Sequence, residues 1–158
     1  MRRKRGAFLL TAVSIAALVL LALPMTASAG AEQIAGVQAL DLGGVCPEAS
    51  LATFTMAGSL VGCWYTDTFS AKTNPSGTVQ GVGTEHFVGC LGATCGTLHM
   101  TFTFTGKFAG PPTFAEIHGR CHHPIVAGDG GFADATGVID FKDDVATGLS
   151  YYRGHIKL

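Results

Sequence analysis

The chain has 158 residues, of which 47% are hydrophobic and only 13% are charged, so it is long enough for one domain with a real core. The first 29 residues contain four of the ten basic residues and none of the eleven acidic ones. Six basic against eleven acidic residues give the remainder a net charge of −5. This balance argues against nucleic acid as a partner, because phosphate binding needs clustered Lys and Arg.

The N-terminal segment has the order of a secretory signal peptide. Four basic residues, 2–5, precede an apolar run from Gly6 to about Leu23, and the small-residue triplet Ala27-Ser28-Ala29 follows. A membrane anchor is the alternative, since about 18 apolar residues can span a bilayer. The A-x-A site favours cleavage after Ala29, which leaves no stable membrane span. We therefore predict a secreted, extracellular protein.

All five cysteines follow the predicted cleavage site, and in an oxidising compartment this indicates two disulfides and one remaining thiol. Cys90 and Cys95 flank a short glycine-containing turn and are the best pair. Cys46, Cys63 and Cys121 are the candidates for the second bridge, and their pairing stays open because it depends on spatial geometry. A buried, inert thiol is the usual state of the residue left over.

Residues 30–50 are rich in Ala and Gly and predict an N-terminal arm with at most one short strand. Residues 51–158 form the predicted barrel domain. Its clearest strand is 97–108, where Leu98 and Phe102 alternate with threonines, as β-branched residues suit a pleated surface. The other segments expected to be extended are 58–71, 78–90, 113–128, 137–141 and 149–158.

Seven or eight strands joined by short turns predict an all-β fold. Successive antiparallel strands favour an up-and-down sheet, and closure removes its exposed edges. We expect a small antiparallel β-barrel of about eight strands, with a β-sandwich as the alternative. No convincing amphipathic helix follows the signal segment.

The stretch "GDGGFADATGVIDFKDD", residues 128–144, holds four glycines and five aspartates. A calcium hand would need a closing Glu, and a nucleotide cradle would need a helix after the glycines; neither is present. The stretch therefore predicts a glycine-rich corner followed by a strand with Val138, Ile139 and Phe141.

The same corner has a family resemblance. Gly130-Gly131-Phe132, followed by Ala135 and Gly137, resembles the corner of the allene oxide cyclase-like barrels, which include the dirigent proteins and many small secreted bacterial proteins. The resemblance implies an eight-stranded antiparallel barrel and covers the strand layout from about Gly58 to Leu158. It implies no particular activity, and we carry over no catalytic residue.

The segment "EIHGRCHH" is the densest polar cluster. On a regular strand, Glu116, His118, Arg120 and His122 share one face, and Cys121 shares the other with His123. Apolar neighbours favour an inward Cys121 face, which would leave the first set on the surface. If that set pointed inward instead, it would orient a polar ligand or move a proton.

Other side chains give weaker indications of a site. Trp64 and Tyr65 are candidates for the mouth of a ligand pocket, although core packing is their more usual role. Glu85 and His86 are expected to form a surface pair. His118 and His122 lie about 13 Å apart on one strand, too far to share an ion without a bend. His86, His99 or His155 are the alternative partners from other strands, but we predict no metal or cofactor.

Three functions are compatible with this sequence. The barrel binds a small apolar molecule; or it is an isomerase- or cyclase-like enzyme that uses its lumen; or it is a structural or interaction protein without a ligand. The lumen distinguishes them. A centre filled by Phe102, Phe104, Phe132 and Phe141 favours the third, and a pocket that contains Glu116, His118 or Arg120 favours the second.

Overall fold

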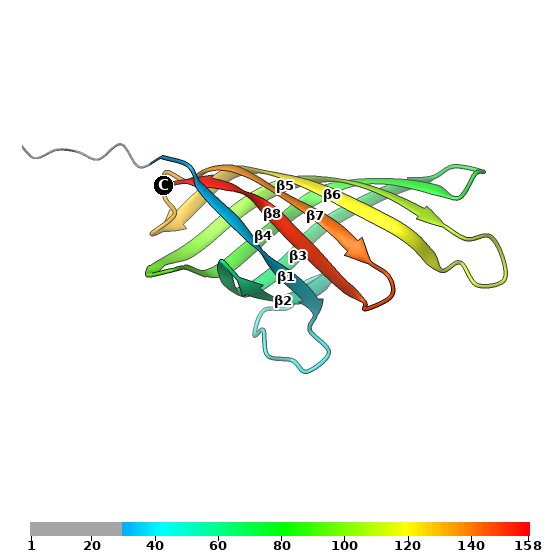
Figure 1. Ribbon diagram of the computed structural model, residues 1–158, viewed down its shortest axis with the longest axis horizontal. Coiled ribbons are helices and arrows are strands. Elements are labelled where there is room, and N and C mark those ends of the chain that lie inside the picture. The colour runs from blue at the N-terminus through cyan, green and yellow to red at the C-terminus, as the bar shows by residue number, and fades with distance from the viewer. Residues whose placement is uncertain (1–29) are drawn as a thin grey trace, which may run out of the picture.

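The computed structural model describes residues 30–158, so the predicted signal peptide lies outside the described residues. The described chain is a closed antiparallel barrel of eight strands, and every strand pairs with its neighbours in sequence (Figure 1). The prediction of a small eight-stranded barrel is confirmed. The strands are β1 (Glu32–Leu40), β2 (Ala52–Gly58), β3 (Leu60–Thr73), β4 (Thr78–Leu91), β5 (Thr94–Phe108), β6 (Glu116–Gly130), β7 (Thr136–Asp144) and β8 (Leu149–Lys157).

The segment expected to be an arm supplies the strand that closes the barrel. β1 pairs with β2 on one side and with β8 on the other, where Val37 lies opposite Tyr151. Ile34 and Gln38 on this strand are buried, and Ala35, Gly36 and Val37 stand between them. The barrel therefore begins at about residue 32 rather than 51, and only residues 41–51 form a connection. The Ala and Gly content of β1 hides its alternation.

The glycine-rich stretch is the predicted corner. β6 ends at Gly130, where φ is +65°, a conformation that favours glycine. Residues 131–135 turn the chain into β7. Phe132 in this corner is completely buried and belongs to the core cluster with Ile34, Leu98 and Ile156. One end of the barrel is thus closed by an aromatic side chain from the corner itself.

Large side chains fill the middle of the barrel as well. Trp64 and Phe87 are fully buried, and the Trp64 ring packs edge-on against Phe141 with 5.0 Å between centroids. Phe102 is also buried, whereas Phe104, nearer the other end, is only half-buried. Three of the four phenylalanines expected in a filled lumen therefore fill it, and the fourth lies where the barrel opens.

The open end results from unequal strand lengths. β3 to β6 have 14 or 15 residues each, whereas β1, β2, β7 and β8 have between seven and nine. The β3–β4 and β5–β6 hairpins project past the two shorter hairpins at this end (Figure 1). We call this end the mouth.

Two disulfides connect four of the cysteines. Cys90 is bonded to Cys95 across the β4–β5 turn, and Cys46 in the 41–51 connection is bonded to Cys63 on β3. Cys121 is a free thiol, so its candidacy for a bridge is wrong. Cys63 precedes the inward Trp64 and faces out of the barrel, whereas Cys121 lines the mouth on the inside. Cys63 and Cys121 cannot form a disulfide because one sulfur lies outside the barrel and the other inside it.

Candidate ligand pocket at the barrel mouth

A pocket of about 360 Å³ lies inside the mouth. This volume is near the lower end of the range of about 300–1,000 Å³ that is usual for small-molecule sites. Apolar and acidic side chains line it from β1, β2, β4, β5, β6, β7 and β8. The main lining residues are Gln38, Phe54, Glu85, Phe104, Glu116, Cys121, His123, Phe141, Asp143 and Ser150.

The floor of the pocket is a buried carboxylate with two hydrogen-bond donors and a histidine beside it. Trp64 Nε1 donates to Glu85 Oε2 over 2.5 Å, and Thr66 Oγ1 donates to Oε1 over 2.7 Å. His123 Nε2 lies 2.8 Å from the same Oε2. The side chains of Glu85 and His123 are 9% and 3% exposed. A carboxylate can be buried at this depth because these neighbours replace its water.

The second nitrogen of His123 indicates where a proton lies. Nδ1 is 3.2 Å from the carbonyl oxygen of Ile139, which can only accept a hydrogen bond, so Nδ1 is the donor. Nε2 faces Glu85 Oε2 at 2.8 Å, so an imidazole and a carboxylate lie next to each other directly under the pocket.

Glu116 lies inside the mouth, not on the surface. Lys107 pairs with His118 but Phe108 pairs with Glu116, so the register shifts and Ile117 is the extra residue of a bulge. The bulge reverses the alternation at the start of β6. The prediction from a regular strand was wrong for this residue alone: His118, Arg120 and His122 are exposed.

Glu116 and Asp143 form a carboxyl pair in the pocket wall. Burial, followed by a hydrogen bond and the charge of Asp143, raises the pKa of Glu116 to about 7. Two carboxyl groups can hydrogen-bond to each other only when one of them is protonated. Ser150 Oγ donates to Asp143 Oδ1 over 2.6 Å, whereas Glu116 Oε1 is buried without a partner among the described residues. The pocket therefore offers an acceptor atom that no protein donor occupies.

Cys121 supplies an unreactive thiol to the same wall. Burial, with smaller contributions from the charges of Glu85, Asp143 and Glu116, raises its pKa well above the ordinary value. Because the thiolate is the nucleophile, this thiol is poorly suited to covalent catalysis. It remains a natural position for a chemical label inside the pocket.

Trp64 and Tyr65, the two remaining predicted site residues, do not line the pocket either. Trp64 belongs to the core below it and contributes only through its bond to Glu85. Tyr65 is buried on the outer side of the wall, where its ring stacks on His86 with 4.7 Å between centroids. His86 is held between Asp67 and Glu48, 2.8 and 3.1 Å from their carboxylate oxygens.

Sequence reasoning missed Glu85, which was expected on the surface beside His86. The signal was available in the alternation of β4, because Glu85 has the same parity as the buried Phe87. Adjacent residues of a strand face opposite sides of the sheet, so Glu85 and His86 cannot both lie on the outer surface. Asp143 was missed because the expected strand ended at residue 141, whereas β7 extends to Asp144.

The residues described here contain no group of three or more His, Cys, Asp or Glu side chains that could hold a metal ion. Within 30–158 there is also no helix with the length and apolar character needed to cross a bilayer. No protein-family model matches this sequence, and comparison with curated proteins finds no relative.

Proposed function

We propose that this protein is exported and binds a small molecule in the mouth pocket. The observation that supports this most is the buried, unpartnered Glu116 Oε1 in the wall of a pocket that also contains three phenylalanine rings. Two disulfides are compatible with an extracellular location. The resemblance to the allene oxide cyclase-like barrels agrees with a ligand inside the barrel.

The lining chemistry narrows the ligand. Phe54, Phe104 and Phe141 suit an apolar body, and Glu116 with Asp143 suits a hydrogen-bond donor at one end of it. An ammonium group satisfies both carboxyl groups and removes the repulsion that keeps one of them protonated. The ligand is therefore a small, largely apolar molecule with an amine or hydroxyl group, rather than a purely apolar one.

The test compares three probes of similar shape by chemical-shift mapping: 2-phenylethylamine, 2-phenylethanol and 3-phenylpropanoate. We expect the amine to bind most tightly and the carboxylate not to bind, with shifts confined to the mouth. The amine should bind about tenfold more tightly at pH 8 than at pH 5.5, because Glu116 loses its proton in between.

Two variants make this test decisive. Glu116→Gln should remove the preference for the amine, and Leu149→Trp, at the pocket wall, should abolish binding of all probes. Leu42→Trp, on the exposed 41–51 connection, is the matched control and should bind normally. Equal affinity for amine and carboxylate, or full binding by the Leu149 variant, would reject the proposal.

Catalysis is a second candidate, favoured by the imidazole of His123 and the carboxylate of Glu85 that lie together under the pocket. Such a pair can remove and return a proton on a bound molecule, as an isomerase requires. A ligand recovered from the protein should then exchange a carbon-bound hydrogen in D₂O only when protein is present. Absence of exchange over many hours would leave binding as the function.

A further inference from the structure

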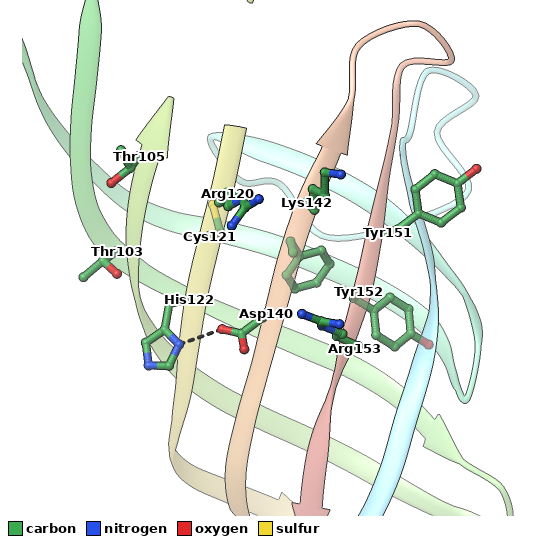
Figure 2. Close-up of a pocket in the computed structure, with 11 residues that line it drawn as sticks. Thr103, Thr105, Arg120, Cys121, His122, Asp140, Lys142, Tyr151, Tyr152 and Arg153 are labelled. Carbon is green, nitrogen blue, oxygen red and sulfur yellow. Dashed lines mark hydrogen bonds and ion pairs between the residues drawn. The ribbon is translucent and has the colours of Figure 1, made fainter. Parts of the chain in front are cut away.

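A second and larger hollow lies on the outside of the barrel. It has a volume of about 720 Å³ and crosses β5, β6, β7 and β8 (Figure 2). Strand register arranges its side chains in two rows across the wall. One row is Thr105, Arg120, Lys142 and Tyr151, and the other is Thr103, His122, Asp140 and Arg153.

The first row contains an unfavourable pair. Arg120 and Lys142 are directly opposite each other on β6 and β7. Like charges in this position are destabilising. Within residues 30–158, no carboxylate oxygen lies within 4.0 Å of the charged nitrogens of Arg120, Lys142 or Arg153. Two adjacent cations without a protein partner indicate a site for an external anion.

The second row adds hydrogen-bonding groups to this charge. His122 Nδ1 lies 2.6 Å from Asp140 Oδ1, so Asp140 is bonded to the imidazole and not to Arg153 opposite it. Arg153 is left with its donors free, about 7 Å along the strands from the first row. Asp140 and the Thr103 hydroxyl supply acceptors among the cations, which suits a ligand that also has hydroxyl groups.

An aromatic ring borders the hollow. Tyr151 is 47% exposed and lies opposite Lys142 on β8. The adjacent Tyr152 is 2% exposed, so the two rings lie on opposite faces of β8. An exposed ring beside polar groups can pack against the C–H face of a sugar while its hydroxyl remains in water.

The charge of the rest of the molecule selects among anionic partners. Half of the six basic residues in the described chain line this hollow, yet that chain has a net charge of −5. A nucleic acid or an anionic membrane needs several Lys and Arg over a wide area, and the carboxylate of Asp140 in the middle opposes a phosphate chain. A carbohydrate chain fits better, because its carboxylates are separated by rings that carry many hydroxyls.

We propose that the outer hollow binds an acidic polysaccharide, with sugar carboxylates on Arg120, Lys142 and Arg153 and a sugar ring against Tyr151. Asp140, held by His122, accepts from the sugar hydroxyls. The site is independent of the mouth pocket, because the β6–β7 wall separates them. It gives an exported protein a means of attachment to an anionic carbohydrate surface.

The experiment titrates the purified protein with hexagalacturonate and with cellohexaose by calorimetry. We expect binding of the uronate alone, weakened several-fold between 50 and 300 mM NaCl because the charges are exposed. Arg120→Gln combined with Lys142→Gln should lower the affinity at least about tenfold. Lys72→Gln, on β3 and exposed, is the matched control and should change it less than about twofold.

The other outcomes separate a glycan site from a general anion site. Tyr151→Ala should lower affinity for the uronate about fivefold and leave competition by inorganic sulfate unchanged. Equal binding of cellohexaose, no effect of the double variant, no effect of Tyr151→Ala, or tighter binding of a DNA oligonucleotide or anionic vesicles would each overturn the proposal. Leu149→Trp should retain uronate binding, so failure here and failure of the mouth-pocket proposal are distinguishable.

Discussion

The mouth pocket and the outer hollow are two sides of one wall with opposite charge. On the inside, β6 and β7 present His123 and Asp143; on the outside, the same strands present Arg120 and Lys142. Each side also has a histidine paired with a carboxylate, His123 with Glu85 inside and His122 with Asp140 outside. Strand alternation thus lets residues 120–123 and 140–143 present two chemically different surfaces.

The two histidine–carboxylate pairs have similar lengths, 2.8 and 2.6 Å, but very different exposure. The inner side chains are 3% and 9% exposed, and the outer ones 57% and 50%. Removal of one partner inside leaves the others buried without hydrogen bonds, whereas water replaces the lost partner outside.

The largest expected effect is the loss of stability when the buried carboxylate is removed. Glu85→Ala should lower the free energy of unfolding by about 3–5 kcal/mol, because His123 and Trp64 lose their partner in the core. Asp140→Ala should cost less than about 1 kcal/mol. Denaturant unfolding at pH 7 measures both. Similar losses from the two variants would show that burial does not distinguish the pairs.

The strand layout followed from the sequence because alternation and turn residues are local signals. The corner at 131–135, the Cys90–Cys95 bond and the outward Arg120 all depend on residues within one or two strands. The place of Glu116 did not follow, because a one-residue bulge reverses the facing of every residue before it. Nothing in "TFAEIHG" marks the position of that bulge.

The partners of the site residues were beyond prediction for a different reason. Glu85 and His123 are 38 residues apart and meet only because the closed barrel brings β4 and β6 to a common interior. Glu116 and Asp143 lie on the paired strands β6 and β7, and they meet because of the register of that pair and the bulge at Ile117. The sequence predicts which face of the sheet each side chain occupies. The level along the barrel at which two side chains meet depends on the strand register.

An effect of intermediate size is expected in the dependence of stability on pH. The folded-state pKa of Glu116 is raised from 4.5 to about 7, so the fold favours the protonated carboxyl. Its contribution to stability is fully present below pH 4.5 and is lost as the pH rises through 7. The melting temperature should therefore fall by a few degrees between pH 5 and pH 8, and Glu116→Gln should reduce that fall.

The control for this measurement is Glu32→Gln, an exposed carboxyl on β1 that should leave the pH profile unchanged. A profile that is the same in the wild-type protein and in the Glu116 variant would contradict a shared proton between Glu116 and Asp143.

The smallest expected effect is a gain in stability that accompanies a loss of binding. Lys142→Glu places a carboxylate opposite Arg120 and next to Tyr151, and converts a repulsive cross-strand pair into an attractive one. Stability should increase by about 0.5 kcal/mol, while affinity for the uronate oligomer is lost. A substitution that stabilises the fold and removes binding is expected where a site retains unfavourable charge for a ligand.

The matched inner change is Asp143→Asn. It should also raise stability above pH 7, because it removes the charge repulsion on Glu116, and it should lower the affinity of the mouth for the amine probe without changing uronate binding. If Lys142→Glu destabilised the protein instead, the cation pair would have a structural role and the argument for an external anion would fail.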